Sequence, residues 1–313
     1  MLKVLFLNRC KYFDYNSSIH IGFISYLQKH FEILECGSRS GFFSNYIETN
    51  GSDLLKISKS FNPDVILTYN SNGSTEGKRN YERLLWAETF LKNTKIKKFH
   101  ITTDHCQLGY DKSQIDWFSN CNIDVAIFRH KSYLKHPVKS KSYWLPFSID
   151  KTLFETNSIK PSEKMKIIGF AGTVNKSLYP ERYKLISFLK SKNRINISNK
   201  KIIGGNYVDF LSNNFANITC GGTPRYFTAK YIEILAAGSL LICSDTDGLD
   251  VIPKDFYLRY DNLNLDNFLN KYENFSSNVY NYSILHQAKQ YMLKHHSHES
   301  RYIKLKEIIE SNA

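Results

Sequence analysis

The chain has 313 residues, of which 42% are apolar, 14% aromatic and 23% charged. This composition supplies a buried core and excludes an intrinsically disordered protein, and the length predicts two domains. The 42 lysine and arginine residues against 29 acidic ones give a formal charge of +13, which favours an anionic partner such as a nucleotide, a phospholipid surface or a nucleic acid.

Several classes of protein are not expected. The longest nearly apolar stretch, Ile234 to Cys243, is far shorter than the ~20 residues that cross a bilayer. The N-terminal residues MLKVLFLN are typical of a first strand rather than of a secretory signal. The six cysteines are scattered without a C-x-x-C pair, which argues against a zinc site or a disulfide framework. We therefore expect a cytoplasmic protein, or one held peripherally at the inner face of the membrane.

Residues 1–146 alternate between strand-like and helix-like segments, which is typical of parallel βαβ units. Helices are expected between the predicted strands, among them Asp53–Phe61 and Tyr81–Lys92. Six strands are predicted, at Lys3–Asn8, Glu32–Cys36, Asp64–Tyr69, Lys97–Thr103, Asp124–Phe128 and Ser142–Phe147. These residues should form a first α/β domain.

The apolar periodicity lapses over residues 147–164, which predicts a linker. A second α/β domain should then cover 165–295, and its tail from His286 to Ile309 should be helical throughout. The predicted elements of this half are a strand at Lys166–Gly172, a helix at Glu181–Leu189, a strand ending at Cys220, a helix at Pro224–Ala237 and a strand at Ser239–Asp245.

The segment Cys220–Asp245 carries the most information. Two glycines leave the strand, Thr223 is a good N-cap, and Pro224 suits the first position of a helix. Lys230 and Glu233 are three residues apart and share a face of that helix, which we expect to be exposed. A glycine-led helix N-terminus offers N–H groups to a phosphate, and the lysine and glutamate would hold a phosphate and a ribose diol. The alternative is an ordinary capped helix with a surface ion pair.

The segment resembles the donor-binding motif of GT-B glycosyltransferases, which Lys230, Glu233 and Gly238 match. The similarity is greatest to the families of spore-maturation-like proteins and group 1 glycosyl transferases. Tyr143–Phe154 resembles their linker, and Ile167–Thr173 resembles the first strand and glycine loop of their nucleotide domain. The resemblance implies an α/β fold of the GT-B class, with two Rossmann-like domains facing a central cleft. The last helix, 296–313, would return to the first domain.

The resemblance also implies a function. It implies transfer of a sugar from a UDP-, GDP- or dTDP-linked donor to a hydroxyl of a glycan or lipid-linked acceptor, in surface polysaccharide or other glycoconjugate synthesis. The donor itself is a substrate, and neither a cofactor nor a metal is expected, since basic side chains and helix dipoles can carry the charge of the diphosphate. The implied donor-binding residues are Gly172, Thr173, Arg182, Thr223, Arg225, Lys230 and Glu233, with Glu233 on the ribose.

One position departs from the pattern of retaining members of the largest related family. These members carry a second glutamate eight residues before the ribose-binding one, where this chain has Arg225. The resemblance therefore does not imply retention of the anomeric configuration, and Arg225 is instead a candidate second cation for the diphosphate.

The catalytic base is expected in the first domain, in loops after the carboxyl ends of its strands. Asp104 and His105, which follow the fourth predicted strand, are the first candidates. His20, at the entry to the first helix, and Asp14, after the first strand, are alternatives.

Two other functions compete. Asp245 and Asp247 form the Asp-Thr-Asp pattern with which a metal-dependent GT-A transferase would hold its donor, although Asp-Gly more often marks a turn. A nucleic-acid-binding or other nucleotide-binding α/β protein would also fit the charge, but the aromatic residues fall mostly in predicted cores, so no nucleic acid is expected. The basic run from His130 to Lys141 is expected to attract an anionic acceptor or an anionic membrane surface.

Overall fold

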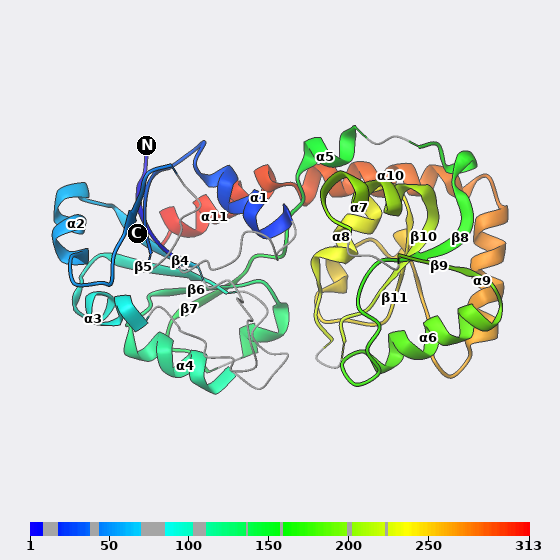
Figure 1. Cartoon of the computed structure of the whole chain (residues 1–313), viewed down its shortest axis with the longest axis horizontal. Coiled ribbons are helices and arrows are strands. Elements are labelled where there is room, and N and C mark those ends of the chain that lie inside the picture. Colours follow the sequence, from blue (N-terminus) through cyan, green and yellow to red (C-terminus); the bar gives the residue numbers. More distant parts are fainter. Residues whose placement is uncertain are drawn as a thin grey trace. The chain divides into compact units, whose positions relative to one another are not determined.

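The structure is a computed structural model of the whole chain (Figure 1). It describes residues 1–8, 18–37, 44–69, 85–102, 111–135, 137–156, 159–198, 202–222 and 225–313, without the side chains of 8, 18–21, 85 and 111–115.

The chain divides into two compact units. Unit 1 comprises Met1–Asn16, His20–Pro146 and Arg301–Ala313, and unit 2 comprises Ser17–Ile19 and Phe147–Ser300.

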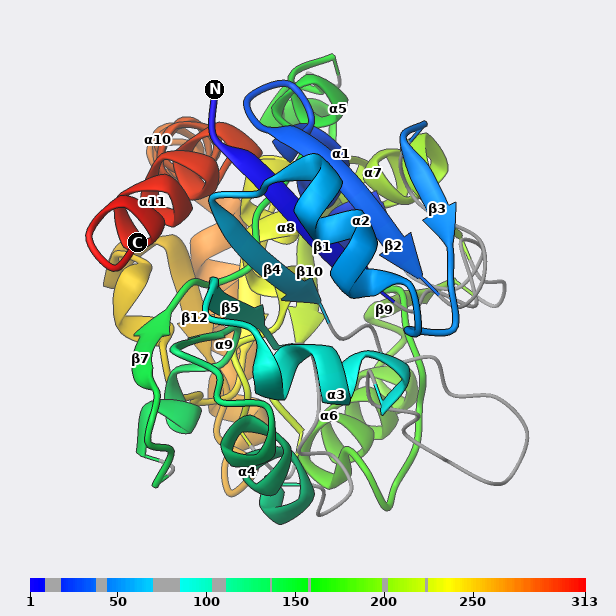
Figure 2. The same ribbon diagram turned by 90° about the vertical axis from the view of Figure 1, so that its left-hand side faces the viewer.

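Unit 1 is built on a seven-stranded parallel sheet with the order β3-β2-β1-β4-β5-β6-β7. Its described strands are β1 (Lys3–Asn8), β2 (Glu32–Gly37), β3 (Tyr46–Glu48), β4 (Val65–Tyr69), β5 (Lys97–Ile101), β6 (Val125–Phe128) and β7 (Lys141–Trp144). Its helices are α1 (Ser18–Leu27), α2 (Leu54–Phe61), α3 (Leu85–Asn93), α4 (Asp111–Asn120), the 3-10 turn η2 (Lys131–Lys135) and most of α11 (His298–Glu310). Figure 2 shows these strands and helices from a second side.

The core of unit 1 follows from strand alternation, because successive side chains point to opposite faces of a sheet. Val4 and Phe6 of β1 share one buried cluster with Phe23 of α1 and with Leu305 and Ile308 of α11. The last helix of the chain therefore completes the core of the first unit.

Unit 2 has a five-stranded parallel sheet with the order β12-β11-β10-β8-β9. Its described strands are β8 (Met165–Phe170), β9 (Ile195–Ile197), β10 (Asn214–Thr219), β11 (Leu240–Cys243) and β12 (Tyr257–Arg259). Its α-helices are α5 (Lys151–Glu155), α6 (Pro180–Ser191), α7 (Gly204–Asn213), α8 (Ala229–Ala236), α9 (Leu265–Ser277) and α10 (Asn281–His295), with 3-10 turns η3 (Pro161–Glu163), η4 (Leu249–Val251) and η5 (Lys254–Phe256).

Helices cover both faces of the unit 2 sheet. On one face Ile168 and Phe170 of β8 pack in a cluster with Leu185 of α6 and Phe268 of α9. On the other face α7 lies close enough for Asn217 Nδ2 of β10 to donate a hydrogen bond to its backbone, at Leu211 O. The expected α/β class with parallel sheets is confirmed.

Two expectations for the elements are wrong. The first sheet has a seventh strand, β3, which was missed because it is only three residues long and mostly exposed, so it shows no apolar periodicity. The tail is not helical throughout, because it breaks at His296 and Ser297 between α10 and α11. There the backbone pairs with the linker instead, since Ile149 N donates to His296 O and His298 N donates to Ile149 O, each at 3.0 Å.

Within the described residues, every helix is too short or too polar to cross a membrane.

Candidate functional site

The candidate site lies at the carboxyl edge of the unit 2 sheet. Ligands bind at this edge in open parallel sheets, because the loops that follow neighbouring strands meet there. Three adjacent strands, β8, β10 and β11, end at Phe170, Thr219 and Cys243. The predicted donor-binding segments follow β8 and β10, so the fold brings them to one edge.

The helix after β10 begins later than the sequence predicts. α8 starts at Ala229 with Thr228 in the N-cap position, whereas a start at Pro224 with Thr223 as the cap was expected. Thr223 and Pro224 themselves lie outside the described residues. Any phosphate contact with the N-terminus of α8 would therefore involve the N–H groups that follow Thr228.

Arg225 lies in the turn before α8 and not at the start of the helix. Its φ of 56° is in the left-handed region, outside the helical range. Its carbonyl oxygen accepts hydrogen bonds from Asp247 N at 3.0 Å and from the hydroxyl of Thr246. These bonds to the loop after β11 replace the bond that a helix would make to residue 229. The side chain of Arg225 is exposed on this turn.

Lys230 and Glu233 share one face of α8, but Glu233 is buried there and Lys230 is half-buried, whereas an exposed face was expected. Glu233 is only 3% exposed. Its Oε2 accepts a hydrogen bond from the hydroxyl of Tyr207 on α7, with 3.1 Å between the oxygens. Lys230 Nζ donates to the carbonyl oxygen of Ala171 in the loop after β8. The face is partly buried because α7 and the β8 loop pack against it.

Burial shifts the pKa values of both members of this pair. It raises the pKa of Glu233 toward neutrality, against the opposing effects of Lys230 and of the Tyr207 hydrogen bond. It lowers the pKa of Lys230, with a further contribution from Arg182, while Glu233 acts in the opposite direction. Each group thus favours the charged form of the other.

Arg182 joins the two loops of the site. From α6, its Nη1 donates to Thr173 O at 3.1 Å and its Nη2 donates to Cys220 O at 3.3 Å. The guanidinium carbon lies 3.9 Å from the centre of the Tyr179 ring, a cation–π contact. The planar fork of arginine therefore fixes the β8 loop against the end of β10.

Gly172 is required by close packing. A Cβ atom at this position would lie 2.6 Å from Lys230 Nζ and 3.2 Å from Cζ of Phe170. Only a glycine lets the ammonium group of Lys230 approach the loop this closely.

The structure thus gathers five of the predicted donor-binding residues at one edge, namely Gly172, Thr173, Arg182, Lys230 and Glu233. The predicted bases Asp104 and His105, and the alternative Asp14, lie outside the described residues. His20 lies in α1, and its side chain is not described.

Two aromatic residues of the site were missed. Tyr207 donates to Glu233, and Tyr179 stacks on Arg182. α7 was not predicted as a helix, although Tyr207, Val208 and Leu211 have helical spacing that signals a buried face. Tyr179 precedes the Pro180 that opens α6, so its place beside the site follows from the helix start.

Among the residues that the structure describes, no group of three or more histidine, cysteine or acidic side chains is arranged to hold a metal ion. Asp245 Oδ2 instead lies 3.1 Å from Nη2 of Arg259, and the backbone of Asp247 pairs with that of Tyr226. Independence from metal stays a prediction.

No family model matches the chain, and no curated protein matches its sequence. Solved structures do match its fold. A glycosyltransferase from Rickettsia africae has a TM-score of 0.67 and 13% identity, over 99% of this chain and 98% of the other. HepE of Anabaena in complex with UDP-glucose has a TM-score of 0.70 and 10% identity, over 99% of this chain and all of the other. An alpha-glucosyltransferase in complex with UDP and a 13-mer DNA has a TM-score of 0.67 and 11% identity, over 98% and 99%.

These likenesses extend over both units, and they show that the fold is GT-B. The expected fold class is confirmed. The alternative of a GT-A fold around Asp245 and Asp247 is wrong, because the chain forms two separate parallel sheets of Rossmann-like topology.

Proposed function

We propose that this protein is a glycosyltransferase that moves a sugar from a nucleotide-sugar donor to an acceptor hydroxyl. The observation that supports this most is the pair of the half-buried Lys230 and the buried Glu233, held by Ala171 O and Tyr207 at the carboxyl edge of unit 2 in a GT-B fold. HepE and the alpha-glucosyltransferase share this fold and were solved with UDP-glucose and UDP.

Glu233 is proposed to bind the ribose of the donor. A carboxylate accepts hydrogen bonds at two oxygens, and Tyr207 occupies only Oε2. Oε1 is then available for a ribose hydroxyl. Because Tyr207 fixes the carboxylate before the donor arrives, the donor need not order this side chain on binding.

Lys230, Arg225 and the N-terminus of α8 are proposed to meet the diphosphate. Lys230 and the helix dipole supply positive charge in a site of low dielectric constant. Arg182 is proposed to contribute positive charge without contacting the diphosphate directly, because its two Nη atoms donate to Thr173 O and Cys220 O. Thr223, which lies outside the described residues, is still proposed to bind the diphosphate, and Gly172 and Thr173 are proposed to line the donor.

UDP-linked sugars are the first donors to test, because two of the proteins with this fold were solved with UDP or UDP-glucose. GDP- and dTDP-linked sugars are the matched alternatives.

The acceptor is proposed to be a hydroxyl of a glycan or lipid-linked molecule, activated by Asp104, His105 or His20 of unit 1. Nucleic acid belongs in the acceptor panel as well, since the alpha-glucosyltransferase was solved with DNA beside UDP. Nucleic acid is therefore a candidate acceptor, although the sequence alone predicts none as a partner.

The basic run of unit 1 does not form one patch. Lys131 lies after the carboxyl end of β6, with its Nζ 5.3 Å from the centre of the Trp144 ring. Lys141 begins β7 at the opposite edge, where its Nζ donates to Asn312 Oδ1 at 2.9 Å. We propose that Lys131 and Lys135 attract an anionic acceptor or anionic lipid surface, and that Lys139 and Lys141 do not.

The experiment that tests the function is a turnover assay with UDP-, GDP- and dTDP-sugars and a panel of glycan, lipid-linked and DNA acceptors. Release of nucleotide with formation of a glycosylated product supports the proposal. EDTA should leave the rate unchanged, because cationic side chains replace the metal. Failure of every donor to bind or turn over would refute it.

A further inference from the structure

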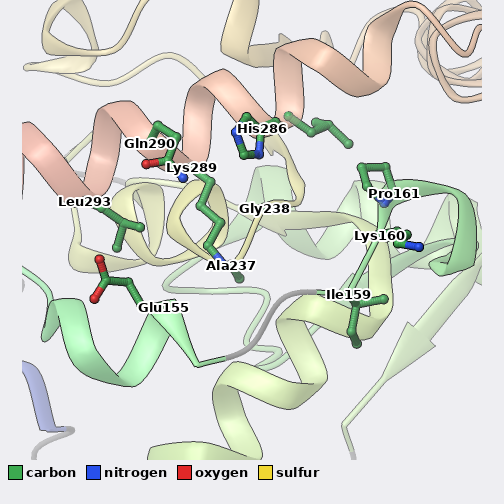
Figure 3. Close-up of a pocket in the computed structure, with 11 residues that line it drawn as sticks. Glu155, Ile159, Lys160, Pro161, Ala237, Gly238, His286, Lys289, Gln290 and Leu293 are labelled. Atoms are coloured by element: carbon green, nitrogen blue, oxygen red, sulfur yellow. The ribbon is translucent and has the colours of Figure 1, made fainter.

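A pocket of unit 2 lies at the other end of α8 from the candidate site. The helix runs from the carboxyl edge of the sheet to its amino edge, where Ala237 and Gly238 lead into β11. These two residues line a pocket of about 310 Å³ between α5, the connector before β8, and α10 (Figure 3). This volume lies within the range of small-molecule sites.

The walls of the pocket combine apolar and polar surface. Leu285 and Leu293 of α10 and Ile159 and Pro161 of the connector supply its apolar surface. Aliphatic surface of this kind suits the C–H faces of a small organic molecule better than a bare inorganic ion, which offers nothing to pack against it.

Three basic side chains surround the same space. They are His286 and Lys289 of α10 and, at the rim, Lys160 of the connector, whose Nζ lies 4.0 Å from Glu163 Oε1 and whose side chain is largely exposed. Lys289 reaches from α10 toward Ala237 (Figure 3). Burial lowers the pKa of Lys289, and Glu155 acts in the opposite direction. An anion in the pocket would strengthen the preference of Lys289 for its charged form.

The helix end at this pocket does not repel an anion as strongly as a bare C-terminus would. The dipole of α8 places partial negative charge there. The ammonium group of Lys164 offsets it, because Nζ donates to Ala237 O at 3.2 Å and to Ser212 O at the end of α7 at 2.5 Å.

Hydroxyl-binding groups lie at one end of the pocket. Glu155 of α5 and Gln290 of α10 both line it, on the same side of Lys289 in the view of Figure 3. A carboxylate accepts from hydroxyls, and an amide both donates and accepts.

We propose that this pocket binds a small hydroxylated phosphate, of the class of sugar and polyol monophosphates. Lys289 and His286 meet the phosphate, Glu155 and Gln290 meet hydroxyls, and the leucines of α10 pack against the carbon skeleton. The inference does not depend on the proposed function, because the pocket and the donor site lie at opposite ends of α8.

Isothermal titration calorimetry of the full chain with glucose 6-phosphate tests this, with glucose and inorganic phosphate as separate probes. Glucose 6-phosphate should bind at least tenfold more tightly than either, since each probe lacks one half of the contacts. Lys289→Gln should weaken that binding at least tenfold. Lys294→Gln is the matched control, because Lys294 is exposed on the same helix outside the pocket and should leave the affinity unchanged.

Gln290→Leu provides a second variant at an exposed position, which folds even if Lys289→Gln does not. It should weaken glucose 6-phosphate binding several-fold and leave the affinity for inorganic phosphate unchanged. Equal affinity for inorganic phosphate and glucose 6-phosphate would overturn the proposal, as would an unchanged affinity in both variants. Displacement of glucose 6-phosphate by UDP would also overturn it, because it would place the ligand in the donor site.

Discussion

Glu233, the proposed ribose-binding residue, is a carboxylate whose pKa is set by its buried surroundings. Burial raises its pKa toward neutrality, and the hydroxyl of Tyr207 counteracts part of that shift by donating to Oε2. Only the ionised form accepts two hydrogen bonds from a ribose diol. Nucleotide affinity should therefore fall as the pH drops through neutrality.

Tyr207→Phe tests this arrangement. Without the hydroxyl the pKa of Glu233 rises further, so the midpoint of the loss of UDP affinity should move to higher pH. At neutral pH the affinity should fall by about 1.5–3 kcal/mol, as for a hydrogen bond to a charged group. UDP titrations between pH 6 and 9 measure both effects.

Tyr272→Phe is the control for that experiment. Tyr272 is also buried in unit 2, but it lies on α9, and its hydroxyl has no hydrogen-bond partner among the described residues. Its variant should keep the pH profile of the wild type. An identical profile in Tyr207→Phe would mean that Tyr207 does not position Glu233.

Gly172→Ala should disrupt donor binding without unfolding the chain. The added Cβ would lie 2.6 Å from Lys230 Nζ, which is the end of a flexible side chain and can move off Ala171 O. Nucleotide affinity should fall at least tenfold while the melting temperature stays within a few degrees. Gly205→Ala is the control, because a Cβ there meets nothing within 4 Å. Wild-type affinity in Gly172→Ala would contradict the placement of Lys230.

The sequence could predict which residues share a face but not whether that face is buried. The three-residue spacing of Lys230 and Glu233 fixes their common side of α8. Their burial depends on α7 and on the β8 loop, which meet the helix only in the folded chain. The role of Tyr207 was missed for the same reason.

Among the elements, α7 and α8 are joined at their C-terminal ends by Lys164. Its Nζ donates to Ser212 O, to Ala237 O and to Ser239 Oγ. Burial, and next the charge of Lys289, lower its pKa from 10.5 to about 7. The unfolded chain thus holds this proton up to a higher pH than the folded chain does. Stability from Lys164 should accordingly rise as the pH increases from 7 toward 10.5.

Lys164→Met should remove both the hydrogen bonds and this pH dependence. The free energy of unfolding of the wild type relative to the variant should increase between pH 7 and pH 9, by up to about 1.4 kcal/mol per pH unit. Urea unfolding at several pH values measures it. Lys166→Met is the control, because Lys166 is an exposed lysine of β8 two residues after Lys164. The free-energy difference between wild type and this variant should not change with pH. A flat difference between wild type and Lys164→Met would show that Lys164 keeps its ordinary pKa.

The two helix boundaries that the sequence predicted wrongly share one physical cause. The start of α8 is delayed because Arg225 O bonds to Asp247 N and Thr246, which are twenty or more residues away in the chain. The break before α11 arises from pairing with Ile149. Such long-range hydrogen bonds cannot be predicted from local helix and strand propensities. The sheets can be predicted, because buried strands and amphipathic helices alternate regularly along the chain.

At the scale of the whole molecule, the GT-B fold could be predicted from the order of weak motifs along the chain. The distribution of charge on the surface could not be predicted. The lysines between His130 and Lys141 are close in sequence, but the fold places them at the two opposite ends of β7.

Two double variants test the proposed role of that charge. Lys131→Gln with Lys135→Gln should raise the KM for an anionic acceptor or weaken binding to anionic liposomes, most clearly at low salt, because the attraction decays within about 8 Å at physiological salt. Lys139→Gln with Lys141→Gln removes the same charge at the other edge and should change neither. Equal effects of the two pairs would show that only net charge matters.

The central claim is that the carboxyl edge of unit 2 binds a nucleotide sugar through Glu233. The most direct measurement is isothermal titration calorimetry of UDP-glucose, GDP- and dTDP-sugars in the presence of EDTA, with the wild type and with Glu233→Ala. One of these donors should bind the wild type without metal, and Glu233→Ala should weaken that binding by about 1–3 kcal/mol while the protein stays folded. Binding of equal strength in Glu233→Ala, or no binding of any donor to the folded wild type, would contradict the claim.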